Sequence, residues 1–191
     1  MDMDKSSRIH ATLKISSEYS RRSWDKPQNS KSKIKRGSEF IVYLSSLSRN
    51  FNSSDPVVGK LARAISLNVE KDLQSAQQHY VAKLTELKAA LSEYRAAMPV
   101  FGEEPRSFEK ERPIPSRYCC SLTYQFFNVY SQYDACSRVL EQLRQLGATT
   151  YDQHKKDQFA LAKEMRVLIE QNSAHIAVFH KKRKALEKAS L

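Results

Sequence analysis

The stretch VGKLARAISLNVEKDLQSAQQHYVAKLTELKAALSEY, residues 58–94, decides the fold of this chain. Its apolar residues recur at steps of three or four, at Val58, Leu61, Ile65, Val69, Leu73, Ala76, Tyr80, Leu84, Leu87, Leu91 and Tyr94. The mean step of 3.6 is the period of an α-helix. Since no Gly or Pro lies between Lys60 and Met98, the spacing predicts one amphipathic helix over residues 56–97, about 60 Å long, or two nearly collinear helices.

A helix of this length with one apolar face needs a partner, either the C-terminal helices or a second copy of the chain. Leucines on one side predict a helix from about 129 to 146, and Gly147 ends it. Thr149 or Thr150 begins a last helix to about Glu170 or further. Residues 56–180 are therefore expected to form a helical support and dimerisation region, and residues 181–191 a frayed basic tail.

The N-terminal third predicts a different local structure. Apolar residues alternate with polar ones over residues 9–15, the pattern of a half-buried strand. A short helix over 17–26 follows, capped by Ser16 or Ser17, and a second helix runs from Gly37 to about Asn50 with Ser38 as its N-cap. Residues 8–50 therefore form a strand–helix–helix unit, residues 1–7 are expected to be disordered, and the fold class is mainly α with a short β-ribbon.

The remaining segment was interpreted as a linker and a second strand. Five Pro and Gly residues and a mixed charge run predict a linker over residues 99–116. Alternating aromatic and apolar residues over 117–126 favour a strand. The sequence leaves open whether the 9–15 strand or the 117–125 strand forms the surface that faces a ligand, or whether the two pair within one chain.

Positive charge is concentrated at the two ends of the sequence. The chain has 191 residues and a net charge of +11. Residues 1–50 carry +6 and residues 151–191 carry +4, whereas the middle hundred residues carry only +1. This distribution favours a polyanion as partner, above all nucleic acid; a basic surface with no specific partner is the alternative.

Enzymatic chemistry and tightly bound cofactors are not expected. The five His residues are scattered, and no nucleophile elbow, Walker loop or HExxH motif is present. The odd count of cysteines, Cys119, Cys120 and Cys136, has no zinc-site spacing, which predicts reduced thiols and no metal. No apolar stretch approaches the length of a transmembrane helix, and the N-terminus lacks a signal-peptide core, so we expect a cytoplasmic protein without a membrane or small-molecule partner.

A two-stranded ribbon fits the major groove of DNA, and this suggests roles for the polar residues of the first strand. Such a ribbon requires an identical strand from a second subunit, because one strand is not stable alone. Arg8, His10, Thr12 and Lys14 are expected to contact base edges. The exposed start of the second helix favours phosphate, and the expected phosphate contacts are Lys33, Lys35, Arg36, Gly37 and Ser38.

The order of one strand and two helices resembles the ribbon-helix-helix DNA-binding family, and the Gly37-Ser-Glu-Phe-Ile start is similar to the beginning of its second helix. From Arg8 to Glu170, the chain also resembles a family encoded on integrative conjugative elements and conjugative plasmids. This resemblance rests on Ile9-His-Ala-Thr-Leu-Lys-Ile, Leu122-Thr-Tyr-Gln-Phe-Phe, Tyr133-Asp134 and Gly147. That family includes a conjugation activator of IncC-type plasmids, a ribbon-helix-helix transcription regulator.

The resemblance implies a homodimeric, sequence-specific regulator that binds a promoter on double-stranded DNA and activates conjugative transfer genes. Two alternatives stay open at this point. The first is a non-specific nucleic-acid-binding accessory protein of DNA transfer, which predicts a steep salt dependence and no preferred site. The second is a helical scaffold whose long helix binds another protein, which predicts no DNA binding.

Overall fold

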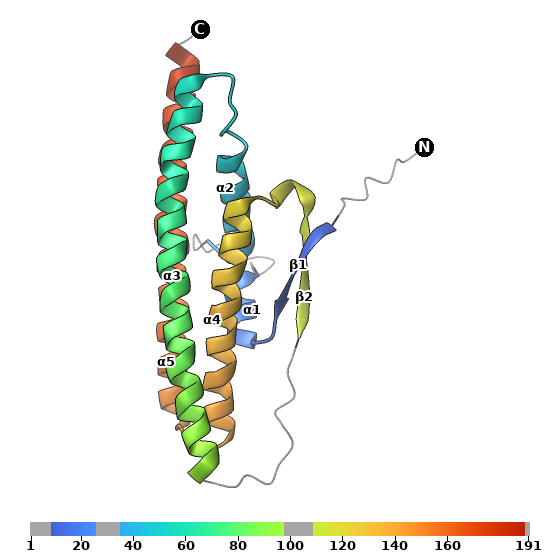
Figure 1. Cartoon of the computed structure of the whole chain (residues 1–191), viewed down its shortest axis with the longest axis vertical. Coiled ribbons are helices and arrows are strands. Elements are labelled where there is room, and N and C mark those ends of the chain that lie inside the picture. The colour runs from blue at the N-terminus through green and yellow to red at the C-terminus, as the bar shows by residue number, and fades with distance from the viewer. Residues whose placement is uncertain (1–8, 26–34, 98–108, 190–191) are drawn as a thin grey trace, which may run out of the picture.

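The computed structural model of the chain describes residues 9–25, 35–97 and 109–189. The elements are β1 (Ile9–Ile15), α1 (Glu18–Trp24), α2 (Gly37–Ser48), α3 (Pro56–Ala97), β2 (Lys110–Pro115), the 3-10 turn η1 (Ser116–Tyr118), α4 (Ser121–Gln145) and α5 (Tyr151–Ala189). The prediction of a mainly α fold with a short β-ribbon is therefore confirmed (Figure 1).

The predicted start near residue 129 is wrong, since α4 begins at Ser121, but local hydrogen bonds mark several other helix ends. Ser17 caps α1 with its side chain, and Asp55 caps α3 by accepting from the Val57 N–H at 2.8 Å. Thr150 accepts from the Gln153 N–H at the start of α5. Gly147 has a φ of 78°, the left-handed conformation that ends a helix, as expected.

Three long helices form the bundle. α3 and α4 run in the same direction and α5 runs against both (Figure 1). The rings of Tyr80 and Tyr133 lie 5.9 Å apart between α3 and α4, and Leu91 packs against Leu143 further along the same pair. The partner that the apolar face of α3 requires is therefore supplied within the chain.

The N-terminal elements pack onto this bundle and share its core. Leu13, Trp24 and Phe40 belong to one apolar cluster with residues of α4 and α5. The Trp24 ring lies 4.9 Å from that of Tyr130 on α4 and 6.1 Å from that of Phe126. Because Trp24 is only 2% exposed, it joins α1 firmly to the bundle.

The predicted strand over 117–126 is wrong, since α4 begins at Ser121 and η1 precedes it. The fully buried residues Leu122, Phe126 and Tyr130 are four apart and lie on one helix face. The alternation over residues 117–126 includes Leu122 and Phe126. It also includes Tyr124, which is 45% exposed on α4.

The predicted linker over 99–116 is also wrong at its C-terminal end, because Lys110–Pro115 forms β2. β2 pairs antiparallel with β1, with Lys14 opposite Glu111 and Thr12 opposite Pro113, and the register shifts between Ile9 and Ala11. The expected ribbon is present, but its second strand comes from the same chain. Residues 98–108 lie outside the described residues, as do the 1–7 segment and most of the expected 27–36 loop.

The basic segment after residue 180 is not a frayed tail, since α5 continues to Ala189. Ile176 and Phe179 are fully buried and Leu186 packs against the core. The apolar face therefore continues past Glu170, where the predicted helix stopped, and keeps the basic residues helical.

Candidate nucleic-acid interface

The ribbon of β1 and β2 has one buried and one exposed face. Leu13, Ile15 and Ile114 are at most 4% exposed, whereas Thr12 and Lys14 are exposed. The alternation predicted from the sequence for this strand is therefore confirmed at these positions. His10 lies in β1 but its side chain is outside the described part, and Arg8 lies outside it altogether.

A buried carboxylate fixes the position of the ribbon on α4. The side chain of Asp134, which is 3% exposed, accepts hydrogen bonds from the backbone N–H groups of Ser16 at 3.0 Å and Ser17 at 2.9 Å. The hydroxyls of Ser17 and Ser137 lie 2.6 Å apart. Hydrogen bonds to a buried charge are strong, so the end of β1 is held rigidly.

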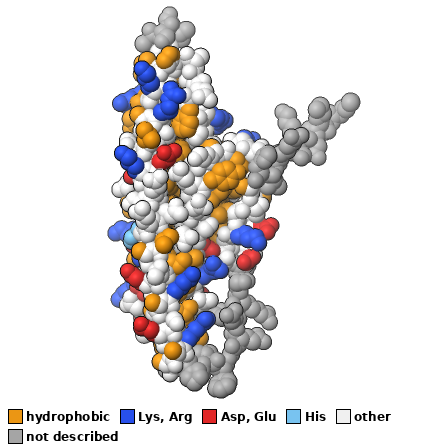
Figure 2. All heavy atoms as spheres, viewed as in Figure 1, with side chains coloured by type: hydrophobic (Ala, Val, Ile, Leu, Met, Phe, Trp, Pro, Cys, Tyr) orange, Lys and Arg blue, Asp and Glu red, His pale blue; other side chains and the backbone are white. Residues whose placement is uncertain are grey.

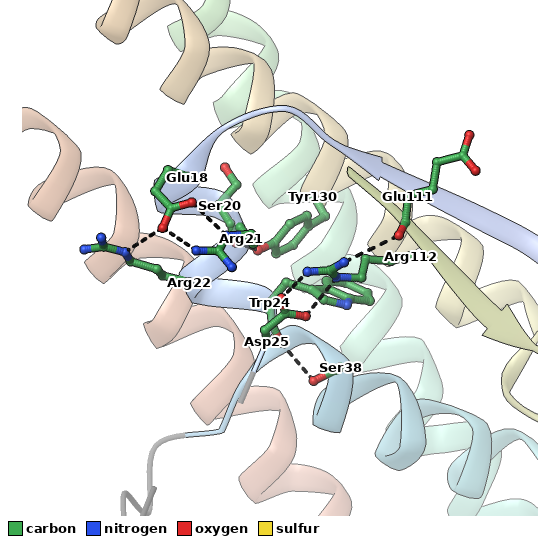
Figure 3. A network of polar contacts seen from close by, with 10 residues as sticks. All are labelled: Glu18, Ser20, Arg21, Arg22, Trp24, Asp25, Ser38, Glu111, Arg112 and Tyr130. Atoms are coloured by element: carbon green, nitrogen blue, oxygen red, sulfur yellow. Dashed lines mark hydrogen bonds and ion pairs between the residues drawn. The ribbon is translucent and has the colours of Figure 1, made fainter. Parts of the chain in front are cut away.

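A second link joins β2 to the two N-terminal helices (Figure 3). The Arg112 guanidinium binds both carboxylate oxygens of Asp25, just after α1, with its Nε at 2.9 Å from Oδ1. Ser38 at the start of α2 donates from its hydroxyl to the Trp24 carbonyl at 2.8 Å. The ribbon, α1 and α2 therefore form one connected unit.

The exposed face of the ribbon carries both signs of charge. The Lys14 ammonium lies 3.9 Å from a Glu109 oxygen and 4.0 Å from a Glu111 oxygen, and all three side chains are more than half exposed. Figure 2 shows basic atoms beside acidic ones on this part of the surface. Exposed pairs of this kind contribute at most about 1 kcal/mol, so Lys14 is free to exchange its partners.

The sequence analysis missed Glu109 and Glu111 as neighbours of Lys14, because it assigned them to the linker. The available signal was the mixed charge run Glu109-Lys-Glu-Arg, which can complement a cationic strand face. Pro113 and Pro115 argued against a strand here, because proline lacks the N–H that a central strand needs.

The expected phosphate contacts at the start of α2 have well-defined surroundings. Gly37 is buried against Trp24, and a Cβ there would lie 2.5 Å from the indole Cε3. Ser38 was predicted to be the N-cap, which is wrong. The N-cap is Arg36, and the Ser38 hydroxyl bonds to the Trp24 carbonyl instead. Gly37 and Ser38 thus both help to hold this helix end against Trp24.

Lys35 and Arg36, the two cations beside this helix end, are better placed to contact an anion than Gly37 and Ser38 are. The Lys35 ammonium lies 4.2 Å from the centre of the Tyr43 ring, and Arg36 donates to the Arg22 carbonyl at 3.0 Å. Lys35, Arg36 and Arg166 line a shallow depression beside α5. The structure therefore brings these two predicted contacts together with a third cation, while Lys33 lies outside the described residues.

The helix end also carries its own anion. The Glu39 carboxylate accepts from the Arg36 N–H at 3.1 Å, as in a capping box. A phosphate at this position would therefore meet a carboxylate as well as the helix N–H groups. The cations, rather than the helix end itself, are the stronger attraction for an anion here.

Across the described ranges, no three His, Cys, Asp or Glu side chains are grouped so as to hold a metal ion, and no helix is long and apolar enough to cross a membrane. The three cysteines are free thiols, and Cys136 is buried. Burial raises the pKa of the Cys136 thiol to about 11, so this thiol stays protonated at neutral pH.

Comparison with known proteins finds a similarity of fold and no similarity to a family model or curated sequence. No protein-family model and no curated protein sequence matches the chain. Among solved structures, the chain is similar to selenomethionine-containing AcaB from uropathogenic E. coli, with a TM-score of 0.53 and 13% sequence identity. The match covers 94% of this chain and 82% of AcaB. The chain therefore has an AcaB-like fold.

Proposed function

We propose that the chain is a sequence-specific DNA-binding transcription regulator, an activator of conjugative transfer genes on a mobile element that acts as a homodimer. The observation that carries this proposal is the ribbon, whose exposed face presents Thr12 and Lys14 while Asp134 and Arg112 hold it against the bundle. The AcaB-like fold and the sequence resemblance support the same function.

The chemistry of the strand suits base recognition in the major groove. Lys14 and Arg8 are donors for guanine O6 and N7, and Thr12 contacts either type of partner or a thymine methyl group. His10 offers one donor and one acceptor when neutral. Glu111, opposite Lys14, adds an acceptor for the amino group of cytosine.

Phosphates beside the bases would be bound at the start of α2. In this proposal Lys33, Lys35 and Arg36 supply the charge, and the N–H groups of Gly37 and Ser38 add hydrogen bonds. Because such contacts carry no sequence information, Lys33→Ala is expected to weaken binding to all duplexes alike.

A second copy would complete the ribbon. β1 is hydrogen-bonded to β2 along one edge only, and the described sheet has two strands. The other edge of β1 is therefore available to the same strand of a partner, which would form a four-stranded sheet. The exposed Leu67 and Val81 on α3 are 56% and 45% accessible and add apolar surface for dimerisation.

Selection from a randomised duplex library tests this function. The full-length wild-type protein is expected to enrich a defined sequence, and Lys14→Ala to lose about 1–3 kcal/mol of binding to that sequence while its binding to other duplexes changes less. Lys156→Ala, an exposed lysine on α5, is the matched control. Absence of any enriched sequence would contradict the proposal.

The carboxylates on the ribbon support one other function, a non-specific nucleic-acid-binding accessory protein. Glu109 and Glu111 leave the exposed ribbon face with no net positive charge, so the attraction for DNA would come from other surfaces. In that case the library selection yields no preferred sequence, and binding falls steeply between 50 and 200 mM salt. If DNA is bound at neither salt concentration, the remaining alternative is a helical scaffold that binds another protein.

A further inference from the structure

Among the described residues, positive charge gathers at one end of the bundle, where the end of α2, the start of α3 and the end of α5 meet (Figures 1 and 2). Residues 49–63 and 180–188 carry a net charge of +6, more than half that of the chain. We call this surface the cationic end. Its basic residues are Arg49, Lys60, Arg63, Lys181, Lys182, Arg183, Lys184 and Lys188.

Specific contacts hold the three segments together. The Ser46 hydroxyl lies 3.1 Å from His180 Nε2, and Arg183 donates to the Asn50 side chain at 3.2 Å. The buried Phe179 places α5 firmly on the core at this level. The helices that carry the charges are therefore folded before a ligand binds, so binding does not have to order their backbone.

The charges of the cationic end are largely unneutralised. Arg183 forms an ion pair with Glu187 at 3.2 Å, and the other seven basic residues are exposed and form no ion pair with described residues. Elsewhere in the bundle, cations such as Lys83 and Arg144 are paired with glutamates. Burial and the charges of Arg183 and Lys184 lower the pKa of His180 below its usual 6.5, as expected in a positive potential.

The spacing of the charges suits an extended polyanion. Lys181, Lys184 and Lys188 follow at steps of three and four, so they lie on one helix face along about 10 Å. That length corresponds to about three phosphates of one strand of a duplex. Lys60 and Arg63 add a neighbouring pair, one turn apart on α3.

Other polyanions fit this surface less well. The large exposed hydrophobic side chains at this end are the aliphatic Val57 and Val178, with no exposed aromatic ring among its described residues, whereas a single-strand binder stacks bases on such rings. The apolar face of α5 here, with Ile176 and Phe179, is buried in the core. A membrane-binding helix would need that face free.

We infer that the cationic end binds the phosphate backbone of duplex DNA beside the segment that the ribbon contacts and supplies sequence-independent affinity. This inference rests on the proposed function for the identity of the ligand. It assigns to folded parts of α2, α3 and α5 a phosphate-binding surface separate from the start of α2.

The test compares two full-length triple variants with the same change of charge on the same helix. One is Lys181→Gln, Lys182→Gln and Lys184→Gln at the cationic end. The control is Lys155→Gln, Lys156→Gln and Lys163→Gln, three exposed lysines toward the other end of α5. Affinity is measured between 50 and 200 mM salt for a selected duplex and a scrambled duplex, after circular dichroism has verified folding.

The variant at the cationic end is expected to reduce the slope of log affinity against log salt by about 2–3, equally for both duplexes. The control should change the slope by less than about 1. Equal slopes for the wild type and the end variant, an equal reduction by the control, or no duplex binding by the wild type would overturn the inference. So would lysine-dependent binding to vesicles of 30% phosphatidylserine with an unchanged DNA slope.

The two proposals fail in different ways. If the wild type prefers no sequence but its salt slope depends on the cationic end, the regulator is contradicted and the phosphate surface is supported. If a preferred sequence is bound and the end variant behaves like the wild type, the phosphate surface is contradicted and the regulator is supported.

Discussion

The ribbon and the cationic end differ in how their charges are arranged. On the ribbon, Lys14 lies between Glu109 and Glu111, so the exposed face has nearly balanced charge. At the cationic end, seven exposed cations form no ion pair with the described residues around them. A balanced polar face discriminates between partners without attracting them strongly, whereas unpaired charge attracts any polyanion. The comparison suggests that selectivity and affinity reside in separate parts of the molecule.

Asp134→Asn is expected to have the largest effect, because it removes a hydrogen bond from a buried group where β1 ends and α1 begins. An amide has a single acceptor oxygen, so one of the Ser16 and Ser17 N–H groups loses its buried partner. We expect a loss of about 2–3 kcal/mol in the free energy of unfolding, measured in urea. Sequence preference should fall, while scrambled-duplex binding persists. Glu93→Gln, an exposed change of the same kind on α3, is the control, and equal stability of both variants would refute this role of Asp134.

Gly37→Ala tests the packing at the start of α2, which belongs neither to the ribbon nor to the cationic end. The added Cβ would lie 2.5 Å from Trp24 Cε3, and overpacking of this kind costs about 1–3 kcal/mol. Urea unfolding measures the loss, and the exposed Ser92→Ala should stay within about 0.5 kcal/mol of the wild type. Since alanine keeps the backbone N–H, weaker DNA binding with unchanged stability would contradict the packing role of Gly37.

Glu111→Gln should make the ribbon resemble the cationic end more closely. Removal of this carboxylate leaves Glu109 as the one acidic neighbour of Lys14 among the described residues and makes the exposed face more positive. We expect affinity for a scrambled duplex at 50 mM salt to rise about threefold, within the range of an exposed charge pair, as measured by fluorescence anisotropy. Glu93→Gln, which changes the same charge away from the ribbon, again serves as the control. Unchanged or weaker binding by Glu111→Gln would show that the ribbon does not face the DNA.

The smallest expected effect concerns the titration of His180. Its folded-state pKa lies below 6.5 because of burial, Arg183 and Lys184, so its contribution to stability is present above pH 6.5 and is lost as the pH falls through the folded value. Lys184→Gln should raise this pKa because it removes one of the neighbouring positive charges, and so should duplex DNA, whose phosphates stabilise the imidazolium. NMR titration of the ring protons measures both changes. A pKa unmoved by DNA would place the duplex away from this surface.

Particular elements show how far the sequence predicts the fold. The long helix over 56–97 was predicted with its observed limits, because eleven apolar positions with a constant mean step leave little room for another structure. The segment around 117–126 was too short for such averaging. Its apolar residues fit a period of two as well as a helix face, and packing of Leu122 and Phe126 in the core selects the helix.

In the candidate site, too, some features follow from the local sequence and others depend on the tertiary structure. The exposure of Thr12 and Lys14 follows from alternation within one strand, so the sequence could predict it. The pairing of Lys14 with Glu111 joins residues almost a hundred positions apart. No local pattern indicates such a contact, and the prolines of β2 argue against a strand unless a partner such as β1 is known.

The sequence by itself determined the long amphipathic helix, the alternating first strand, the caps at Ser17 and Thr150, and the excess of positive charge. These features depend on short-range periodicity, local hydrogen bonds and composition. Only the tertiary structure decided that the ribbon closes within one chain, that α5 extends through the basic segment, and that the end of α2, the start of α3 and the end of α5 meet at one end of the bundle (Figure 1). The physical reason is that each of these outcomes depends on the burial of apolar faces from distant segments in one core, which fixes the positions of the polar residues outside it.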